Sequence, residues 1–320
     1  MNIIRNISIA ITSYNRPQLL RKTLKSIADL NLYISVLIID DNSPRQCEIE
    51  NVISEFKYSN LIIRFYKNVI NIGEVESKKR LFSLIETEYF FLLGDDDTLN
   101  ISAKNFFSVI DVSGTDCDFV FCGYREIDEY DRVLKTRYSF VPISSKQQTS
   151  SSLKIFSRFV TFPFYYCHPA LYLARTSSAK RLSLDNNIGI GEDYDLLWRI
   201  LNDPKIKWRI LPDLIMNWRK HAIQSANQSA NLQNRLETKR MILEKYECTD
   251  TPLSRFWFVL LPTYFDLRSG LKLTNLKSSS WEKKLLLSSS NRFIRGIMFV
   301  LYSCYKAFEY LVIQFKFAFL

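Results

Sequence analysis

Glycine is scarce in this chain. It accounts for 8 of 320 residues, and none of the eight lies in the loop that follows the first predicted strand, residues 7–11. Dinucleotide-binding folds and Walker loops both need glycine at that point, because glycine lets the backbone approach a phosphate closely. The absence excludes both kinds of phosphate loop. A phosphate ligand would therefore need another partner here.

Cysteine and histidine are sparse as well. The six cysteines include no C-x-x-C pair and the chain has only two histidines, so neither a zinc site nor a disulfide framework is indicated. Reduced thiols are the expected state. The first residues run straight into a strand without the long apolar stretch of a signal peptide. These features predict a cytoplasmic protein.

The first half of the chain alternates short apolar strands with helical stretches. Strands are predicted at 7–11, 36–39, 61–66, 89–93 and 118–124, and helices are predicted to begin at Pro17, Pro44 and Glu74. Proline is tolerated at the first helical position. Strands that alternate with helices predict an α/β fold with a mostly parallel, Rossmann-like sheet flanked by helices. A polar hairpin is predicted near residues 128–131.

Three consecutive aspartates, Asp95, Asp96 and Asp97, directly follow the strand at 89–93. An isolated acidic triplet is more often a solvated surface loop. Here, however, the acids end a buried strand, and ligands of parallel sheets bind beyond the carboxyl ends of the strands. Carboxylate oxygens at this density suit a hard divalent ion such as Mg²⁺ or Mn²⁺. The pattern predicts a site for a nucleoside diphosphate held through a metal ion.

A second acidic segment lies at residues 189–199. Its glycines precede a helix whose first turn carries Glu192 and Asp193, and apolar residues follow. Acids in a first turn complement the helix dipole, which is one explanation of the pattern. A catalytic carboxylate is the other. We expect Leu196, Leu197 and Ile200 to anchor this helix in the core.

In order and spacing, these motifs resemble the family 2 glycosyltransferases, which are inverting, nucleotide-sugar-dependent enzymes with the GT-A fold. The resemblance covers about residues 5–225. Each motif is weak alone, but six in order are specific. They are Thr12-Ser13-Tyr14-Asn15-Arg16, Ile39-Asp40-Asp41-Asn42-Ser43, Asn71-Ile72-Gly73, Gly94-Asp95-Asp96-Asp97, Gly191-Glu192-Asp193-Tyr194-Asp195 and Trp218-Arg219-Lys220-His221.

The resemblance implies roles for single residues. Thr12 and Asp41 match positions that recognise the nucleobase, and Asp193 matches the general base. The metal, Mn²⁺ or Mg²⁺, is implied to bind at Asp96, Asp97 and His221. Further donor-binding residues are implied at Tyr14, Asn15, Arg16, Lys78, Asp95 and Arg219. One departure is that the first acid of the family's D-x-D signature falls on Gly94, so either Asp95 takes its place or contacts to the ribose are weaker.

Charge divides the chain unevenly. Residues 1–200 hold 24 basic and 24 acidic side chains, whereas residues 201–320 hold 19 basic and 9 acidic ones. We predict a glycosyltransferase domain at 1–225, with a nucleotide-sugar half at about 1–100 and an acceptor half at about 101–225. Residues 226–320 are predicted to form a mainly helical basic extension. No nucleic-acid-binding motif is present, so an anionic membrane surface is the favoured partner of the basic charge.

The basic extension lacks a run long enough to cross a membrane. Between residues 281 and 320 the longest uncharged run, residues 296–305, is far below the roughly 20 residues required. A helix lying in the membrane interface is favoured, and a helix packed on the protein's own core or on a second copy is the alternative. We therefore expect a peripheral protein on the inner face of the cell membrane.

Taken together, the sequence predicts an inverting glycosyltransferase. It would move a sugar from a UDP- or dTDP-sugar to a hydroxyl of a glycan or lipid-linked oligosaccharide, in bacterial surface polysaccharide synthesis such as O-antigen or capsule. One alternative is a metal-dependent nucleotidyltransferase, which normally has a basic or glycine-rich phosphate loop after the first strand. The other is a catalytically inactive scaffold on the membrane surface, which would not need both the metal acids and Asp193.

Overall fold

The computed structural model describes residues 2–137, 143–144, 172–185 and 192–221. The chain divides into two units, residues 1–255 and 256–320, and every described residue belongs to the first. The predicted basic extension at 226–320 lies outside the described residues. Among the described residues, no helix is long and apolar enough to cross a membrane.

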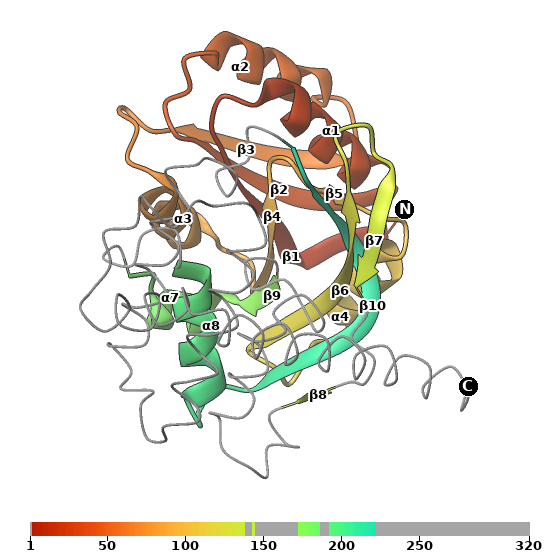
Figure 1. Ribbon diagram of the computed structural model, residues 1–320, viewed down its shortest axis with the longest axis vertical. Coiled ribbons are helices and arrows are strands. Elements are labelled where there is room, and N and C mark those ends of the chain that lie inside the picture. The colour runs from red at the N-terminus through yellow and green to blue at the C-terminus, as the bar shows by residue number, and fades with distance from the viewer. Residues whose placement is uncertain (1, 138–142, 145–171, 186–191, 222–320) are drawn as a thin grey trace, which may run out of the picture. The chain divides into compact units, whose positions relative to one another are not determined.

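The described strands form one mixed sheet (Figure 1). Its order is β3-β2-β1-β4-β9-β6-β10-β5, with β7 beside β6 and β8 beside β10. The strands are β1 (Asn2–Ser13), β2 (Leu32–Asp40), β3 (Leu61–Lys67), β4 (Tyr89–Gly94), β5 (Thr98–Leu99), β6 (Phe119–Ile127), β7 (Val133–Arg137), β8 (Ile143–Ser144), β9 (Tyr172–Arg175) and β10 (Trp208–Arg219). The helices are α1 (Pro17–Ala28), α2 (Gln46–Glu55), α3 (Glu74–Leu84), α4 (Ala103–Ser113), α7 (Thr176–Leu182) and α8 (Glu192–Asn202).

The first four long strands are parallel, as predicted, because a helix connects each to the next. The second half is mixed. β9 runs antiparallel to both β4 and β6, and β7 runs antiparallel to β6. The turn from Asp128 to Arg132 joins β6 to β7, which confirms the predicted hairpin. A connection this short permits only antiparallel pairing.

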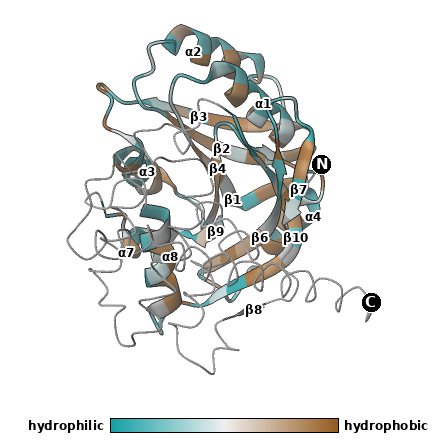
Figure 2. Ribbon diagram, viewed as in Figure 1, coloured by the Kyte–Doolittle hydropathy of each residue, from teal (hydrophilic) through white to brown (hydrophobic). Residues whose placement is uncertain are grey.

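Helices cover both faces of the parallel strands. Phe90 and Phe91 are neighbours on β4 and therefore point to opposite faces. The ring of Phe91 contacts Phe107 of α4, whereas the ring of Phe90 contacts Phe82 of α3. In Figure 2 the strands are largely hydrophobic in colour, while α1 and α2 carry both colours. Strands buried on both faces explain why β2 and β4 are almost wholly apolar.

The sheet brings the polar ends of three strands to one edge. Thr12 at the end of β1 lies in register with Ile39 of β2 and with Gly94 of β4. Asp41 and the triple aspartate therefore emerge beside one another, as the sequence predicts. This shared carboxyl edge positions the candidate site.

Candidate active site

The triple aspartate forms a buried turn. Asp95 is 0%, Asp96 8% and Asp97 3% exposed, so the turn is not the solvated loop that its charge alone would suggest. The hydroxyl of Thr23 on α1 lies 2.7 Å from the carbonyl oxygen of Asp97 and 3.0 Å from that of Asp95. Because buried carboxylates are costly unless they are paired, this turn requires positive partners.

Arg16 and His221 are the partners that the structure places at the turn. The guanidinium of Arg16 lies 2.7 Å from Asp95 Oδ1 and 2.6 Å from Asp96 Oδ2. His221 Nε2 lies 2.9 Å from the same Asp96 oxygen. Arg16 was predicted only as a donor contact, and its pairing with acids about 80 residues away was not predicted. Burial and these contacts shift the pKa values of the three acids in different directions.

The pKa values of the three carboxyl groups diverge. Burial raises the pKa of Asp95 to about 7, and it raises the pKa of Asp97 well above its usual range. For Asp96 the effect of burial is outweighed by the hydrogen bond with His221 and by the charge of Arg16, so its pKa lies below the usual value. Asp96 is therefore the acid of this turn whose ionised form the surroundings favour most.

Asp41 and the Asn71-Ile72-Gly73 motif form one structure. Asp41 Oδ1 accepts hydrogen bonds from Asn68 Nδ2 at 2.7 Å and from the Ile72 amide at 2.9 Å, and Oδ2 accepts from the Gly73 amide at 2.8 Å. Gly73 has φ of +85°, which favours glycine. An ionised carboxyl group has about four acceptor sites, so one site on Asp41 remains for a ligand. Both motifs were evident in the sequence, but the contact of Asn68 with Asp41 and with Ser77 Oγ in the first turn of α3 was not.

The loop after β1 is held by the loop after β2. The Asn15 amide donates to Ser43 Oγ at 2.7 Å, and the Ser43 amide donates to the fully buried carboxylate of Asp40 at 2.9 Å. Asn15 has φ of +56°, and its Oδ1 is buried with no hydrogen-bond partner in the described part of the chain. Thr12 is half-buried and Tyr14 is exposed beside it. The predicted donor-binding residues of this loop therefore lie together at the site edge.

Helix α8 starts at Glu192 and carries Asp193, half-buried, in its first turn. Leu196, Leu197 and Ile200 are buried, which confirms the predicted anchor in the core. Gly189 and Gly191 lie outside the described residues.

Lys78 contacts two carboxylates where the resemblance implied a diphosphate contact. Its Nζ lies 2.7 Å from Glu74 Oε1 and 2.7 Å from Glu192 Oε1. Burial alone would lower the pKa of Lys78, but the charges of Glu192 and Glu74 outweigh it and raise the pKa well above its usual value. The lysine is therefore charged, and acids of the chain already neutralise it.

Comparison with known proteins decides the family. Residues 8–177, more than half of the chain, match the family model described as Glycosyl transferase family 2. The chain belongs to glycosyltransferase family 2. This membership confirms the predicted resemblance and places the chain among glycosyltransferases rather than nucleotidyltransferases.

A curated relative supports the family 2 assignment. The uncharacterized glycosyltransferase MJ1057 of Methanocaldococcus jannaschii is 25% identical over 202 residues. The match spans 62% of this chain and 66% of the relative, just under two thirds of its length.

Solved structures support the fold. The S. aureus TarS structure, residues 1–349, superposes with a TM-score of 0.58 at 15% identity and covers 87% of this chain and 77% of its own. The mannosyltransferase PcManGT of Pyrobaculum calidifontis, solved with GDP-Man and Mn²⁺, gives a TM-score of 0.53 at 11% identity, covering 95% and 83%. At these identities the likeness concerns the fold, and it confirms the predicted GT-A type.

Gly94, the departure from the signature of family 2, has a steric reason. A Cβ on Gly94 would lie 2.7 Å from Asp96 Oδ1 and 2.9 Å from Asp97 Oδ2. An aspartate at this position would force both carboxylates to move. Asp95 itself is fully buried and contacts Arg16 and the Tyr14 amide. Its contact with the donor stays a prediction.

Arg219 makes contacts that were not predicted. Its side chain is 0% exposed, its Nε donates to the carbonyl oxygen of Asp96 at 2.8 Å, and its amide donates to Asp97 Oδ1 at 2.8 Å. Its guanidinium also donates to the carbonyl oxygen of Asp128 and pairs with Asp131 at 2.6 Å. These contacts hold the acidic turn and the β6–β7 hairpin together, and the contact of Arg219 with the donor stays a prediction.

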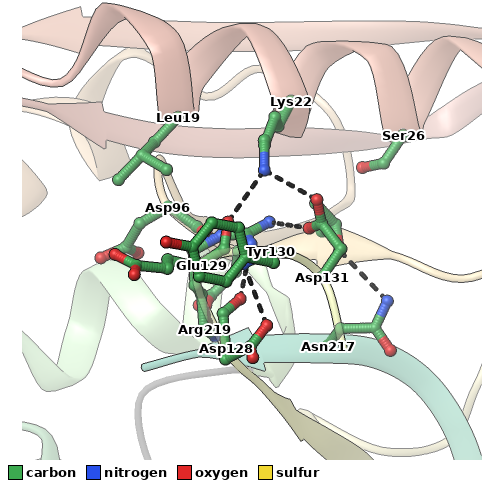
Figure 3. A network of polar contacts seen from close by, with 12 residues as sticks. Leu19, Lys22, Ser26, Asp96, Asp128, Glu129, Tyr130, Asp131, Asn217 and Arg219 are labelled. Carbon is green, nitrogen blue, oxygen red and sulfur yellow. Dashed lines mark hydrogen bonds and ion pairs between the residues drawn. The ribbon is translucent and has the colours of Figure 1, made fainter. Parts of the chain in front are cut away.

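Figure 3 shows how this support continues into α1. Lys22 Nζ lies 2.7 Å from Asp131 and 3.1 Å from the carbonyl oxygen of Glu129, so the hairpin between β6 and β7 is tied to α1 as well as to Arg219. The hairpin, Arg219 and α1 together therefore hold the turn that carries Asp96. No sequence pattern indicated this contact between segments about 110 residues apart.

The acids fit a metal ion whose coordination the donor completes. Asp96 Oδ1 and Asp97 Oδ2 converge above Gly94, and oxygen ligands suit Mg²⁺ or Mn²⁺. Within the described residues, no group of three or more His, Cys, Asp or Glu side chains is arranged to hold a metal ion by itself. Mg²⁺ commonly binds through one or two carboxylates together with substrate phosphates. This donor set therefore fits a metal ion that arrives with the nucleotide.

Proposed function

We propose that the chain is an inverting glycosyltransferase that uses a UDP- or dTDP-sugar and a hydroxyl acceptor on a glycan or lipid-linked oligosaccharide. The observation that carries the proposal is the buried acidic turn, in which Asp96 and Asp97 lie at the same sheet edge as Asp41 and Thr12. A nucleotide-sugar requires a site for its metal-bound diphosphate beside a site for its nucleobase.

Each residue at the edge has a task in this proposal. Thr12 and the remaining acceptor site of Asp41 orient the nucleobase, and Asp96, Asp97 and His221 hold Mn²⁺ or Mg²⁺. When bound, the metal ion neutralises charge on the departing diphosphate. Tyr14, Asn15 and Arg16 line the same edge on the donor side.

Asp193 supplies the base in this proposal. Its carboxylate takes the proton of the acceptor hydroxyl as the oxygen attacks the anomeric carbon. The new glycosidic bond forms as the bond to the diphosphate breaks, and attack from the opposite face inverts the configuration. No covalent intermediate with the chain is needed.

The first test is calorimetric titration of UDP, dTDP and GDP into the full chain with Mn²⁺, with Mg²⁺ and with chelator. A carboxylate at Asp41 accepts a hydrogen bond from the imide N–H of uracil or thymine, so we expect metal-dependent binding of UDP or dTDP. GDP binding tightest would contradict the proposed donor class, and no binding of any nucleotide would contradict the whole proposal. TarS has been solved with UDP-GlcNAc, which makes this sugar nucleotide the first donor to assay.

We also propose that residues 226–320 act at an anionic membrane surface, on the cytoplasmic side, where a lipid-linked acceptor of bacterial surface polysaccharide synthesis would lie. The excess of basic side chains in this segment, 14 against 7 acidic ones, supports this proposal. The full chain is expected to sediment with vesicles containing phosphatidylglycerol, less so as salt rises. A chain truncated after residue 276 is the control. Equal sedimentation of both would refute the proposed role of the segment removed.

A further inference from the structure

A buried lysine connects the two halves of the site. Lys78 lies on α3, in the nucleotide half, and its Nζ contacts Glu74 one turn earlier and Glu192 at the start of α8. The side chains of Lys78 and Glu192 are 9% and 7% exposed, whereas that of Glu74 is 57% exposed. The two buried partners are 114 residues apart in the chain. We call this contact the Lys78 bridge.

The Lys78 bridge is not well explained by stability. Two charges taken out of water lose hydration that their attraction only partly returns, so apolar residues of similar volume often stabilise as well or better. A buried ion pair does, however, fix the relative position of two elements, because breaking it leaves a buried charge unpaired. Here the pair fixes the start of α8 relative to α3.

The bridge holds the first turn of α8. Further along, Arg199 of α8 pairs with Asp195 and donates to the carbonyl oxygens of Leu182 and Ser183, at the end of α7. Helix α7 is tied in turn to the end of α3, where Lys180 Nζ lies 3.0 Å from the carbonyl oxygen of Ile85. Figure 1 shows these three helices gathered together. Both ends of α8 thus take their position from α3.

Helix α3 itself starts at the nucleotide site. The amide of Gly73, its N-cap residue, donates to Asp41, and Asn68 donates both to Asp41 and to Ser77 in the first turn of α3. A continuous set of polar contacts therefore runs from Asp41 through α3 and Lys78 to Glu192. The next residue is Asp193.

We propose that Lys78 is a positioning residue, which holds the first turn of α8 so that Asp193 faces the donor site at the distance the reaction requires. The inference rests on the proposed role of Asp193 as the base. In this proposal Lys78 acts through Glu192, which its Nζ contacts, and not through the donor. A displacement of about 1 Å in a catalytic group can cost 100-fold in rate, so loss of the bridge acts on kcat rather than on nucleotide affinity.

The test compares Lys78→Met, Glu192→Gln and the double variant in the full chain. The matched control is Lys79→Met, which removes an ion pair with Glu76 on the same helix that does not reach α8. Three quantities are measured: kcat for release of UDP from UDP-GlcNAc (or from the nucleotide-sugar of the class that the titration selects), the Kd of the corresponding nucleoside diphosphate, and the midpoint of thermal unfolding.

We expect each single variant to lower kcat by about 10- to 100-fold while the Kd stays within about threefold. Lys78→Met should also lower the unfolding midpoint, because it leaves the buried carboxylate of Glu192 without its charged partner. Glu192→Gln should lower the midpoint less, because Lys78 keeps its ion pair with Glu74. Removal of both charges should return the midpoint toward the original value. A purely structural pair predicts that kcat recovers with it. A positioning pair predicts that kcat stays low in the double variant.

Two results would overturn the inference. One is a double variant with the original kcat, which would reduce the bridge to a structural contact. The other is a nucleotide Kd raised at least tenfold by Lys78→Met but not by Glu192→Gln, which would make Lys78 a phosphate ligand. Asp193→Asn, measured in parallel, tests the proposed base separately from the positioning role of Lys78. If this variant is fully active, the proposed base is wrong; if it is inactive while the double variant is active, only the positioning role is wrong.

Discussion

Asp96→Asn is expected to abolish the metal-dependent part of nucleotide binding. Of the three acids in the turn, Asp96 is the one whose pKa lies below its usual value, and one of its oxygens faces Asp97 across Gly94. An amide cannot supply the negative oxygen that a hard divalent ion prefers. We expect the affinity for the selected nucleoside diphosphate in Mn²⁺ to fall more than about 100-fold, to the level measured with chelator.

The substitution is designed to leave the fold intact. Arg16 keeps its ion pair with Asp95 at 2.7 Å, and the asparagine amide oxygen can still accept a hydrogen bond from His221. The unfolding midpoint, measured with the same samples, should therefore change little. Asp116→Asn, which alters an exposed acid paired with Arg209, is the control. Unchanged affinity and unchanged metal dependence in Asp96→Asn would show that the metal does not depend on this turn.

The positions of the strands and of the acidic turn were predictable from the sequence, because both depend on local pattern. An apolar run followed by polar residues marks the carboxyl end of a buried strand, and parallel strands bring such ends to one edge. Thr12, Asp41 and Asp96 met there as expected. The mixed second half was not predictable in this way, because a strand of four residues such as β9 carries too short a pattern to indicate its direction.

Long side chains account for most of what the sequence missed. Arg16, Lys78 and Arg219 were all expected near the donor, since the family resemblance assigns a position in the chain and not the direction of a side chain. Each of these side chains contacts an acid or a carbonyl oxygen far away in the sequence. Which acid a lysine or arginine reaches depends on how helices pack, and no spacing rule connects residue 78 with residue 192. The resemblance thus located the site, while the contacts within it needed the fold.

Asp193→Asn is expected to lower kcat by about 100- to 10,000-fold, the range that a general base contributes. The amide keeps the size of the side chain but cannot take the proton of the acceptor hydroxyl. Because Asp193 lies on α8 and not in the acidic turn, metal-dependent nucleotide binding should stay as tight as in the original chain. The acidic limb of the pH dependence of kcat, which reports the ionisation of the base, should disappear with it.

The control for Asp193→Asn is Asp203→Asn, which changes an acid just beyond the end of α8 and should leave kcat unchanged. A fall in kcat together with an equal loss of nucleotide affinity would indicate damage to the donor site instead of loss of a base. Full activity in Asp193→Asn would leave the acids in the first turn of α8 with the other role that the sequence allowed, which is to complement the helix dipole. Retained binding with lost turnover is the result that separates a catalytic carboxylate from a helix cap.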